Sequence, residues 1–160
     1  MYIFDGAMGT MLQAAGLEEG YCPELFNIER PEVVKDIHAQ YLQHGSDVIT
    51  TNTFGACGLK LEDYDLQDRV REINIAAVKV AKEAIAETKP TARVAGSMGP
   101  TGRFLQPLGN MSFDSIYDTY REQAEALIEG GVDFIIIETI IDVQEMRAAL
   151  LASLDAREAA

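Results

Sequence analysis

Short β-rich segments alternate with helical patterns along the whole chain, and this alternation restricts the possible folds more than any other feature. Strands are expected at residues 2–4, 47–51, 92–97 and 132–137, which recur about every 45 residues. Segments 45–53 and 131–139 also align letter by letter, with Gly, Asp, Ile and the final Thr in equivalent places. Strand–helix alternation favours a parallel sheet of right-handed βαβ units. The sequence therefore predicts an α/β protein with four βα units.

The segments between these strands carry helical periodicity. Helices are expected at 11–15, 31–44, 66–87, 112–130 and from 142 onwards, whereas 17–27 is expected to be a loop. The long apolar run of the fourth strand is typical of a strand that is buried on both faces. Asp142 and Glu145 have the spacing of a capping box. The apolar stripe of the last helix is expected to consist of Val143, Met146, Leu150, Leu151 and Leu154.

Composition excludes several classes of protein. The chain has 160 residues, 48% of them hydrophobic and 24% charged, as in one globular domain. A balance of 13 basic against 26 acidic residues argues against nucleic-acid and anionic-membrane partners. No apolar run is long enough to span a membrane, and no secretory signal is found at the N-terminus. Two isolated cysteines do not indicate a disulfide framework, so a reducing cytoplasm is expected.

The first ten residues combine a carboxylate with free backbone amides. Asp5 stands where the first strand ends, and Gly6 and Gly9 let a ligand approach the backbone closely. The amides of residues 8–10 are expected at a helix N-terminus, which suits a carboxylate or phosphate. Such a stretch can bind the zwitterion of an amino acid. A plain strand–turn–helix corner without a ligand explains the same residues.

Polar residues end each of the four expected strands. Asp5, Asn52, Ser97 and Glu138 occupy these positions, and parallel strands bring them to one edge of the sheet. Ligands bind at this edge in barrels and in open α/β sheets. The four residues therefore indicate a site for a small molecule that bears a cation. Alternatively, Asp5 caps a helix and Glu138 pairs with a surface Arg or Lys.

Other reactive side chains give weaker signals. Cys22 and Cys57 have too few ligand candidates nearby in sequence to indicate a metal site. His38 and His44 are expected at the surface or at the edge of the core. The sequence contains neither a GxGxxG motif nor a P-loop lysine motif, so nucleotide binding has little support.

Four motifs occur in a fixed order along the chain, at Asp5–Thr10, Thr51–Gly55, Gly96–Gly102 and Ile137–Thr139. Shorter motifs lie at Leu25–Asn27, Arg30–Glu32 and Pro107–Gly109. Each motif alone is weak, but their shared order and spacing are specific. From about residue 2 to residue 154 they resemble the homocysteine S-methyltransferase domain, including the homocysteine-binding barrel of cobalamin-dependent methionine synthase.

This resemblance implies a (β/α)₈ TIM barrel that binds homocysteine at its C-terminal face and methylates the homocysteine thiol to give methionine. Asp5 and Glu138 would face the ammonium group, and the backbone of residues 6–10 would hold the carboxylate. The implied substrate-binding residues are Asp5, Gly6, Ala7, Met8, Gly9, Thr10, Asn52, Thr53, Ser97 and Glu138.

The resemblance also implies what this chain lacks. Residues 1–160 correspond to the N-terminal half of such a barrel, whereas the zinc-binding cysteines of the family lie in the second half. No catalytic or metal-binding residue is therefore assigned here. Zinc, and methylcobalamin where it is the methyl donor, are implied for the full-length enzyme only, and this chain alone is expected to be inactive. The sequence does not identify the methyl donor, which could equally be S-methylmethionine or a betaine-like compound.

Two functions remain open at this point. The chain is either the homocysteine-binding part of a methyltransferase or a non-catalytic half-barrel that binds an amino acid or a partner protein. In both cases the first and fourth strands are expected to have an unpaired edge. The expected partner is the missing C-terminal half or a second copy of the chain in a homodimer.

Overall fold

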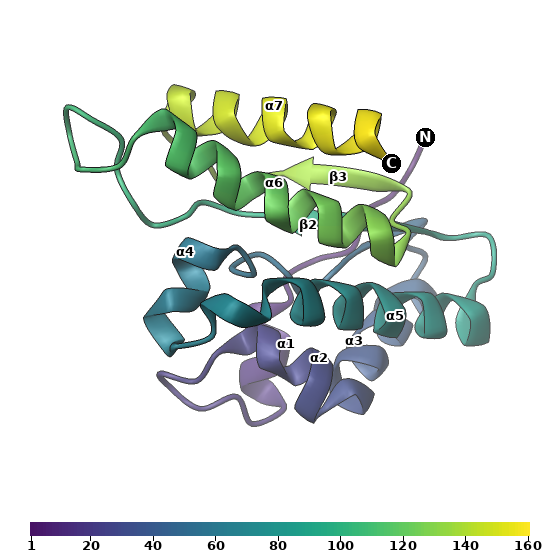
Figure 1. Cartoon of the computed structure of the whole chain (residues 1–160). Coiled ribbons are helices and arrows are strands. Elements are labelled where there is room, and N and C mark those ends of the chain that lie inside the picture. The colour runs from purple at the N-terminus through teal and green to yellow at the C-terminus, as the bar shows by residue number, and fades with distance from the viewer.

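A computed structural model describes residues 1–160 and contains one parallel three-stranded sheet (Figure 1). The strands are β1 (Val48–Thr50), β2 (Arg93–Met98) and β3 (Phe134–Ile137), in the order β1-β2-β3. β1 pairs with β2 through Ile49 and Val94, and β2 pairs with β3 through Ser97 and Ile136. The predicted parallel βαβ arrangement is therefore confirmed for these strands, although β1 and β3 are shorter than expected and β2 is shifted by one residue.

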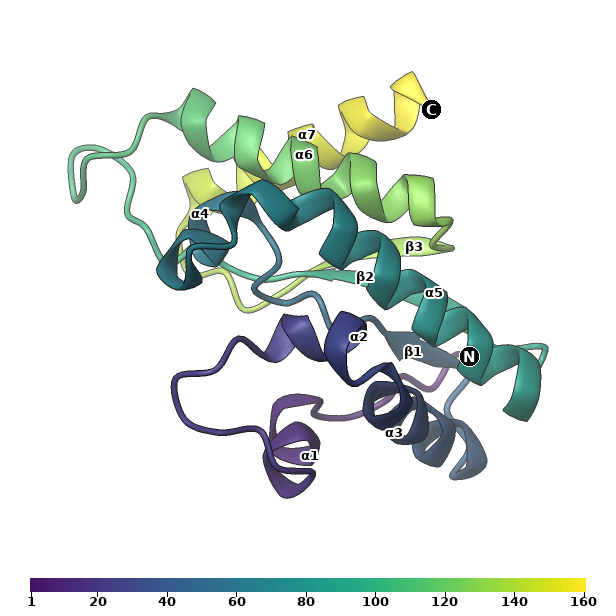
Figure 2. The same ribbon diagram turned by 60° about the horizontal axis from the view of Figure 1, so that its bottom comes forward.

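Four long or medium helices connect and cover the strands. They are α3 (Pro31–Gln43), α5 (Val70–Thr88), α6 (Phe113–Gly130) and α7 (Val143–Ala159), and each packs against the next (Figure 2). Both chain termini lie at the same end of the molecule. No helix is both long and apolar enough to cross a membrane. The sequence signals at the ends of α6 are confirmed, since Ser112 caps its first turn and Gly131 ends it with φ of +87°.

Short helical turns occupy segments that were expected to be irregular. The expected loop at 17–27 in fact contains a 3-10 turn, and the expected start of α5 is a separate 3-10 turn. The short elements are α1 (Gly9–Ala14), α2 (Phe26–Glu29), α4 (Gly58–Leu61) and the 3-10 turns η1 (Pro23–Leu25), η2 (Glu62–Tyr64) and η3 (Gln67–Arg69).

The expected first strand is reduced to a single bridge between Phe4 and Val48. The Asp47 and Val48 amides donate to the Ile3 carbonyl, and the Asp5 amide donates to the Val48 carbonyl. Tyr2 and Phe4 are 58% and 46% exposed, so the prediction of a buried strand is wrong. The reason is that β1 covers one edge of this segment and nothing covers the other.

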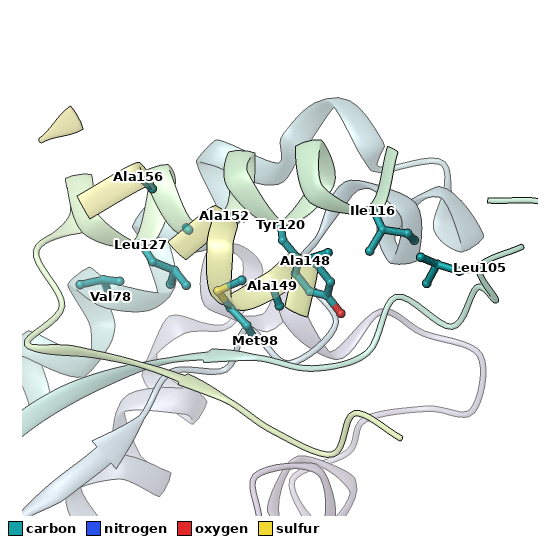
Figure 3. Close-up of a cluster of buried hydrophobic side chains, with 11 residues drawn as sticks. Val78, Met98, Leu105, Ile116, Tyr120, Leu127, Ala148, Ala149, Ala152 and Ala156 are labelled. Atoms are coloured by element: carbon teal, nitrogen blue, oxygen red, sulfur yellow. The ribbon is translucent and has the colours of Figure 1, made fainter. Parts of the chain in front are cut away.

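The largest apolar cluster lies between β2, α5, α6 and α7 (Figure 3). On α5 the buried residues match the predicted stripe, as Val70, Ile73 and Ala77 are fully buried. On α7 the prediction is wrong, because alanines form the buried face and Leu150, Leu151 and Leu154 are exposed. The alanines that α7 contributes to this cluster are Ala148, Ala149, Ala152 and Ala156.

β3 is also less buried than its apolar sequence suggests. Phe134 is exposed, and Ile135, Ile136 and Ile137 are only partly buried. β3 is the last strand of the sheet, so one of its edges has no neighbouring strand. The prediction of a strand buried on both faces is therefore wrong for the chain as it stands.

Candidate functional site

A cleft of about 260 Å³ lies where the C-terminal ends of the strands meet the first loop. The backbone turn between the first segment and α1 forms one wall, and residues at the ends of β1, β2 and β3 form the others. The lining residues are Gly6, Ala7, Met8, Gly9, Pro23, Glu24, Thr50, Thr51, Asn52, Phe54, Ser97 and Glu138. The cleft thus lies at the edge of the sheet at which α/β proteins bind ligands.

Asp5 lies beside the cleft and is held by β1. Its carboxylate accepts hydrogen bonds from the Thr50 amide (2.8 Å) and the Thr50 hydroxyl (2.9 Å). Burial raises the pKa of Asp5 to about 6, although the Thr50 hydrogen bonds act in the opposite direction, and the nearby charge of Glu138 adds to the rise. A cation that entered between the two acids would reverse this effect and favour the ionised carboxylate.

Glu138 reaches the same cleft from the end of β3. The Ser97 hydroxyl donates to its Oε1 at 2.6 Å, which fixes the carboxylate beside β2. The next residue, Thr139, has φ of +60°, a left-handed conformation that is unfavourable for a β-branched side chain. Such strained residues cluster at ligand sites. The strain therefore supports a functional role for this turn.

Asn52 lines the cleft, and its side chain also links two segments of the chain. Its side-chain amide donates to the Pro23 carbonyl, and the Asn27 amide donates in return to the Asn52 carbonyl, both at 2.8 Å. Glu24 joins the same two segments, since its Oε1 accepts from the Gly55 amide at 2.7 Å. A methyl group on Gly55 would lie 2.8 Å from that oxygen, so a larger residue there would displace the Glu24 carboxylate. These hydrogen bonds hold residues 22–27 against the end of β1, where they form one wall of the cleft.

Glu24 itself was missed from sequence because residues 17–27 show no helical periodicity. It is 5% exposed, lines the cleft and keeps both carboxylate oxygens engaged, as the Cys22 thiol donates to Oε2 at 3.3 Å. An acidic residue directly after a proline and before an apolar pair is the one signal that could have indicated it. Because both oxygens are engaged, Glu24 holds residues 22–27 in place and has no oxygen free for a ligand.

A buried polar network supports the floor of the cleft. The Thr53 hydroxyl donates to the Ser97 carbonyl at 2.8 Å, and the Gln123 side chain on α6 donates to the Thr53 carbonyl at 2.8 Å. Asn74 on α5 donates to the Ala56 carbonyl at 2.9 Å. These bonds join the chain just after β1 to the end of β2. They therefore fix the distance between Asn52 and Ser97.

The structure separates the predicted site residues into two groups. Thr53 is fully buried in the floor, and Thr10 is exposed on α1 outside the lining, so neither contributes a side chain to the cleft. Asp5 borders the lining through Thr50. The predicted residues that line the cleft are Gly6, Ala7, Met8, Gly9, Asn52, Ser97 and Glu138.

The chain is similar to known proteins over nearly its whole length. A model of the homocysteine S-methyltransferase family matches residues 2–159. The chain is 41% identical over 159 residues to methionine synthase from Mycobacterium tuberculosis and 39% identical to the one from Mycobacterium leprae. Both alignments cover 93% of this chain and 13% of the relative.

Solved structures show the same relationship. The homocysteine methyltransferase MmuM from Escherichia coli, in its oxidized form, matches with a TM-score of 0.82 at 26% identity. Its metallated form matches with a TM-score of 0.81 at 27% identity. The chain belongs to the homocysteine S-methyltransferase family. It spans 60% of either MmuM chain and a much smaller part of the methionine synthases.

The family implies a metal, and the residues of this chain do not fit one. No three His, Cys, Asp or Glu side chains lie together in a geometry that could hold a metal ion. Burial raises the pKa of both cysteines to about 12, with the charge of Glu24 as a further cause at Cys22. Zinc binds the thiolate form, which these pKa values disfavour. No step of a reaction is therefore assigned to a metal held here.

Elemental analysis of the purified chain tests this assignment. Protein prepared without chelator is expected to contain less than stoichiometric zinc, because Cys22 and Cys57 are buried thiols without further ligands. A Cys57→Ser variant serves as the control and should show the same metal content. One tightly held zinc per chain that disappears in this variant would contradict the assignment.

Proposed function

We propose that the chain is the homocysteine-binding portion of a homocysteine S-methyltransferase of the methionine synthase type. In this role it corresponds to the N-terminal half of a (β/α)₈ barrel, residues 1–160. The observation that carries the proposal is that Glu138 and the backbone of residues 6–9 line one cleft, with the carboxylate of Asp5 beside it. The full-length enzyme would transfer a methyl group to the homocysteine thiol and give methionine.

The amino acid end of homocysteine suits the two sides of this cleft. Its ammonium group would lie between the carboxylates of Asp5 and Glu138, where a cation relieves their mutual repulsion. Its carboxylate would face the amides of the turn at Met8 and Gly9, since no side chain caps the first turn of α1. Asn52 and Ser97 would set the width of the site through the bonds described above.

The chemical step requires residues that this chain does not supply. In the full-length enzyme zinc would activate the thiol, held by cysteines that lie outside residues 1–160. Methylcobalamin is one possible methyl donor of the whole enzyme, and none of the described residues selects among donors. The described residues bind and orient the substrate, and we assign no catalytic residue among them. The compartment that this proposal requires is a reducing cytoplasm, where a thiol substrate stays reduced.

A second candidate function is a non-catalytic half-barrel that binds a partner protein. The observation that favours it is the exposure of apolar side chains at both ends of the sheet, among them Tyr2, Phe4 and Phe134. The two candidate functions differ in whether the cleft binds a ligand. Only the first requires recognition of an amino acid.

Calorimetric titration distinguishes them. We expect L-homocysteine to bind more tightly than 4-mercaptobutanoate, which lacks only the ammonium group. Glu138→Ala should weaken homocysteine binding by about 1–3 kcal/mol, the usual cost of removing a charged hydrogen-bond partner. Glu158→Ala at the exposed end of α7 is the matched control and should leave the affinity unchanged. Equal binding of the two thiols, or an unchanged dissociation constant in Glu138→Ala, would contradict the proposed function.

A further inference from the structure

The turn at residues 6–8 presents free backbone amides beside the cleft. Gly6, Ala7 and Met8 line the cleft, precede α1 and belong to no helix or strand. Their amides donate to no acceptor within the chain. Successive free amides in a turn can bind an anion. They can do so only if the turn keeps one orientation, so a contact that fixes the turn matters for binding.

Tyr41 on α3 makes such a contact. Its hydroxyl donates to the Ala7 carbonyl at 2.8 Å, and this carbonyl accepts from no other donor of the chain. The same hydroxyl lies close to Gly6, because a methyl group built there would stand 2.9 Å from it. Tyr41 therefore contacts two consecutive residues of the turn, and Gly6 leaves the space that the hydroxyl needs.

The core of the protein sets the position of the Tyr41 hydroxyl. The Tyr41 side chain packs against two apolar clusters at once. One cluster joins α1, α2, α3 and α5, and the other joins α3, α5, β1 and β2. A side chain that is packed on two sides has little freedom to change rotamer. The hydroxyl is therefore a fixed donor for the turn.

The peptide bond between Ala7 and Met8 carries this contact to the Met8 amide. This bond is trans and planar, so its C=O and N–H groups point in opposite directions. The C=O group is directed at Tyr41, which does not line the cleft. The N–H group of Met8 is consequently directed to the other side of the turn, away from Tyr41.

We propose that Tyr41 is a positioning residue for the carboxylate of the substrate. Its hydroxyl holds the Ala7 carbonyl and thereby aims the Met8 N–H into the cleft, where this amide donates to the carboxylate of a bound amino acid. Tyr41 itself does not touch the substrate. The inference rests on the proposed function, because it requires an amino acid in the cleft. It predicts that Tyr41 favours only those ligands that carry a carboxylate.

Calorimetric titration with two ligands tests this role. 3-Aminopropane-1-thiol lacks only the carboxylate of L-homocysteine, and Tyr41→Phe removes only the hydroxyl while the ring keeps its packing. The variant should bind homocysteine about threefold to tenfold more weakly than wild type, which is the usual effect of one hydrogen bond. Its affinity for 3-aminopropane-1-thiol should be unchanged. A general disturbance of the cleft would instead weaken the binding of both ligands.

Tyr117→Phe is the matched control, because it removes a hydroxyl that donates to Asp155, and neither residue lines the cleft. It should bind both ligands as wild type does, and urea denaturation checks that each variant is folded. If Tyr41→Phe kept the wild-type ratio of the two dissociation constants, the role of Tyr41 would be overturned and the proposed function would stand. If wild type itself bound the two thiols equally, the carboxylate contact of the proposed function would be wrong, and this inference with it.

Discussion

The His38→Leu variant is expected to be more stable than wild type at pH 7 by about 1–3 kcal/mol, the usual desolvation cost of a buried polar group without a partner. His38 on α3 is fully buried, and neither ring nitrogen has a hydrogen-bond partner. Leucine has a similar volume and no polar atom. It should therefore occupy the position without this cost.

The difference between the two proteins should widen in acid. Burial lowers the pKa of His38 to about 4, from an ordinary value of 6.5. Titration of His38 therefore leaves the stability of wild type unchanged above pH 6.5 and lowers it as the pH falls from 6.5 to about 4, because only the unfolded chain takes up the proton there. The loss amounts to about 3 kcal/mol over this range.

Urea denaturation of both proteins at about pH 7 and about pH 4.5 measures the effect. His44→Leu is the matched control, because it removes an exposed imidazole at the end of α3 and leaves the buried His38 in place. A gap between His38→Leu and wild type that is the same at both pH values would show that His38 is accessible to protons in the folded chain.

A Glu145→Ala variant is expected to lose about 3 kcal/mol of its free energy of unfolding. Glu145 on α7 is 4% exposed, and its Oε1 accepts from the Thr101 amide and hydroxyl, both at 2.7 Å. The Tyr120 hydroxyl lies 3.0 Å away and can donate either to this oxygen or to the Gly99 carbonyl. Alanine would leave the two Thr101 donors buried without an acceptor, and each such group costs about 1–3 kcal/mol.

The same denaturation experiment, at pH 7, separates this effect from the loss of a helical side chain. Glu145→Gln keeps an acceptor but removes the charge, so we expect a stability between those of wild type and the alanine variant. Glu158→Ala lies on the same helix in solvent and should stay within about 0.5 kcal/mol of wild type. If Glu145→Ala lost no more free energy of unfolding than Glu158→Ala, the loop at residues 99–102 would not depend on the Glu145 carboxylate.

The features that could be predicted from sequence are those set by neighbours along the chain. The apolar stripe of α5 follows from its periodicity, and the ends of α6 follow from Ser112 and Gly131. The placement of Asn52, Ser97 and Glu138 at one edge follows from parallel strands and from the aligned repeats. Each of these inferences needs only the geometry of one element or of one βα unit.

The failures share a different cause, which is contact with residues far away in the chain. Glu145 has the spacing of a capping partner, yet its carboxylate binds Thr101 while Asp142 alone caps α7. Glu24 lies in a segment without periodicity, and Gly55 is its partner only after folding. Tyr2 and Phe4 were expected to be buried because apolar side chains usually pack against other residues. In this chain no element packs over them.

The alanine face of α7 has a consequence for how substitutions are tolerated. Small side chains at Ala148, Ala149 and Ala152 let α7 pack closely against α6, so an added methylene there has no room. Leu150 and Leu154 point into a groove and could become polar without disturbing that packing. Along this helix, hydropathy therefore predicts the wrong positions to be sensitive to substitution. In a single chain the alanines would tolerate few substitutions, and the leucines would tolerate many unless a partner covers them.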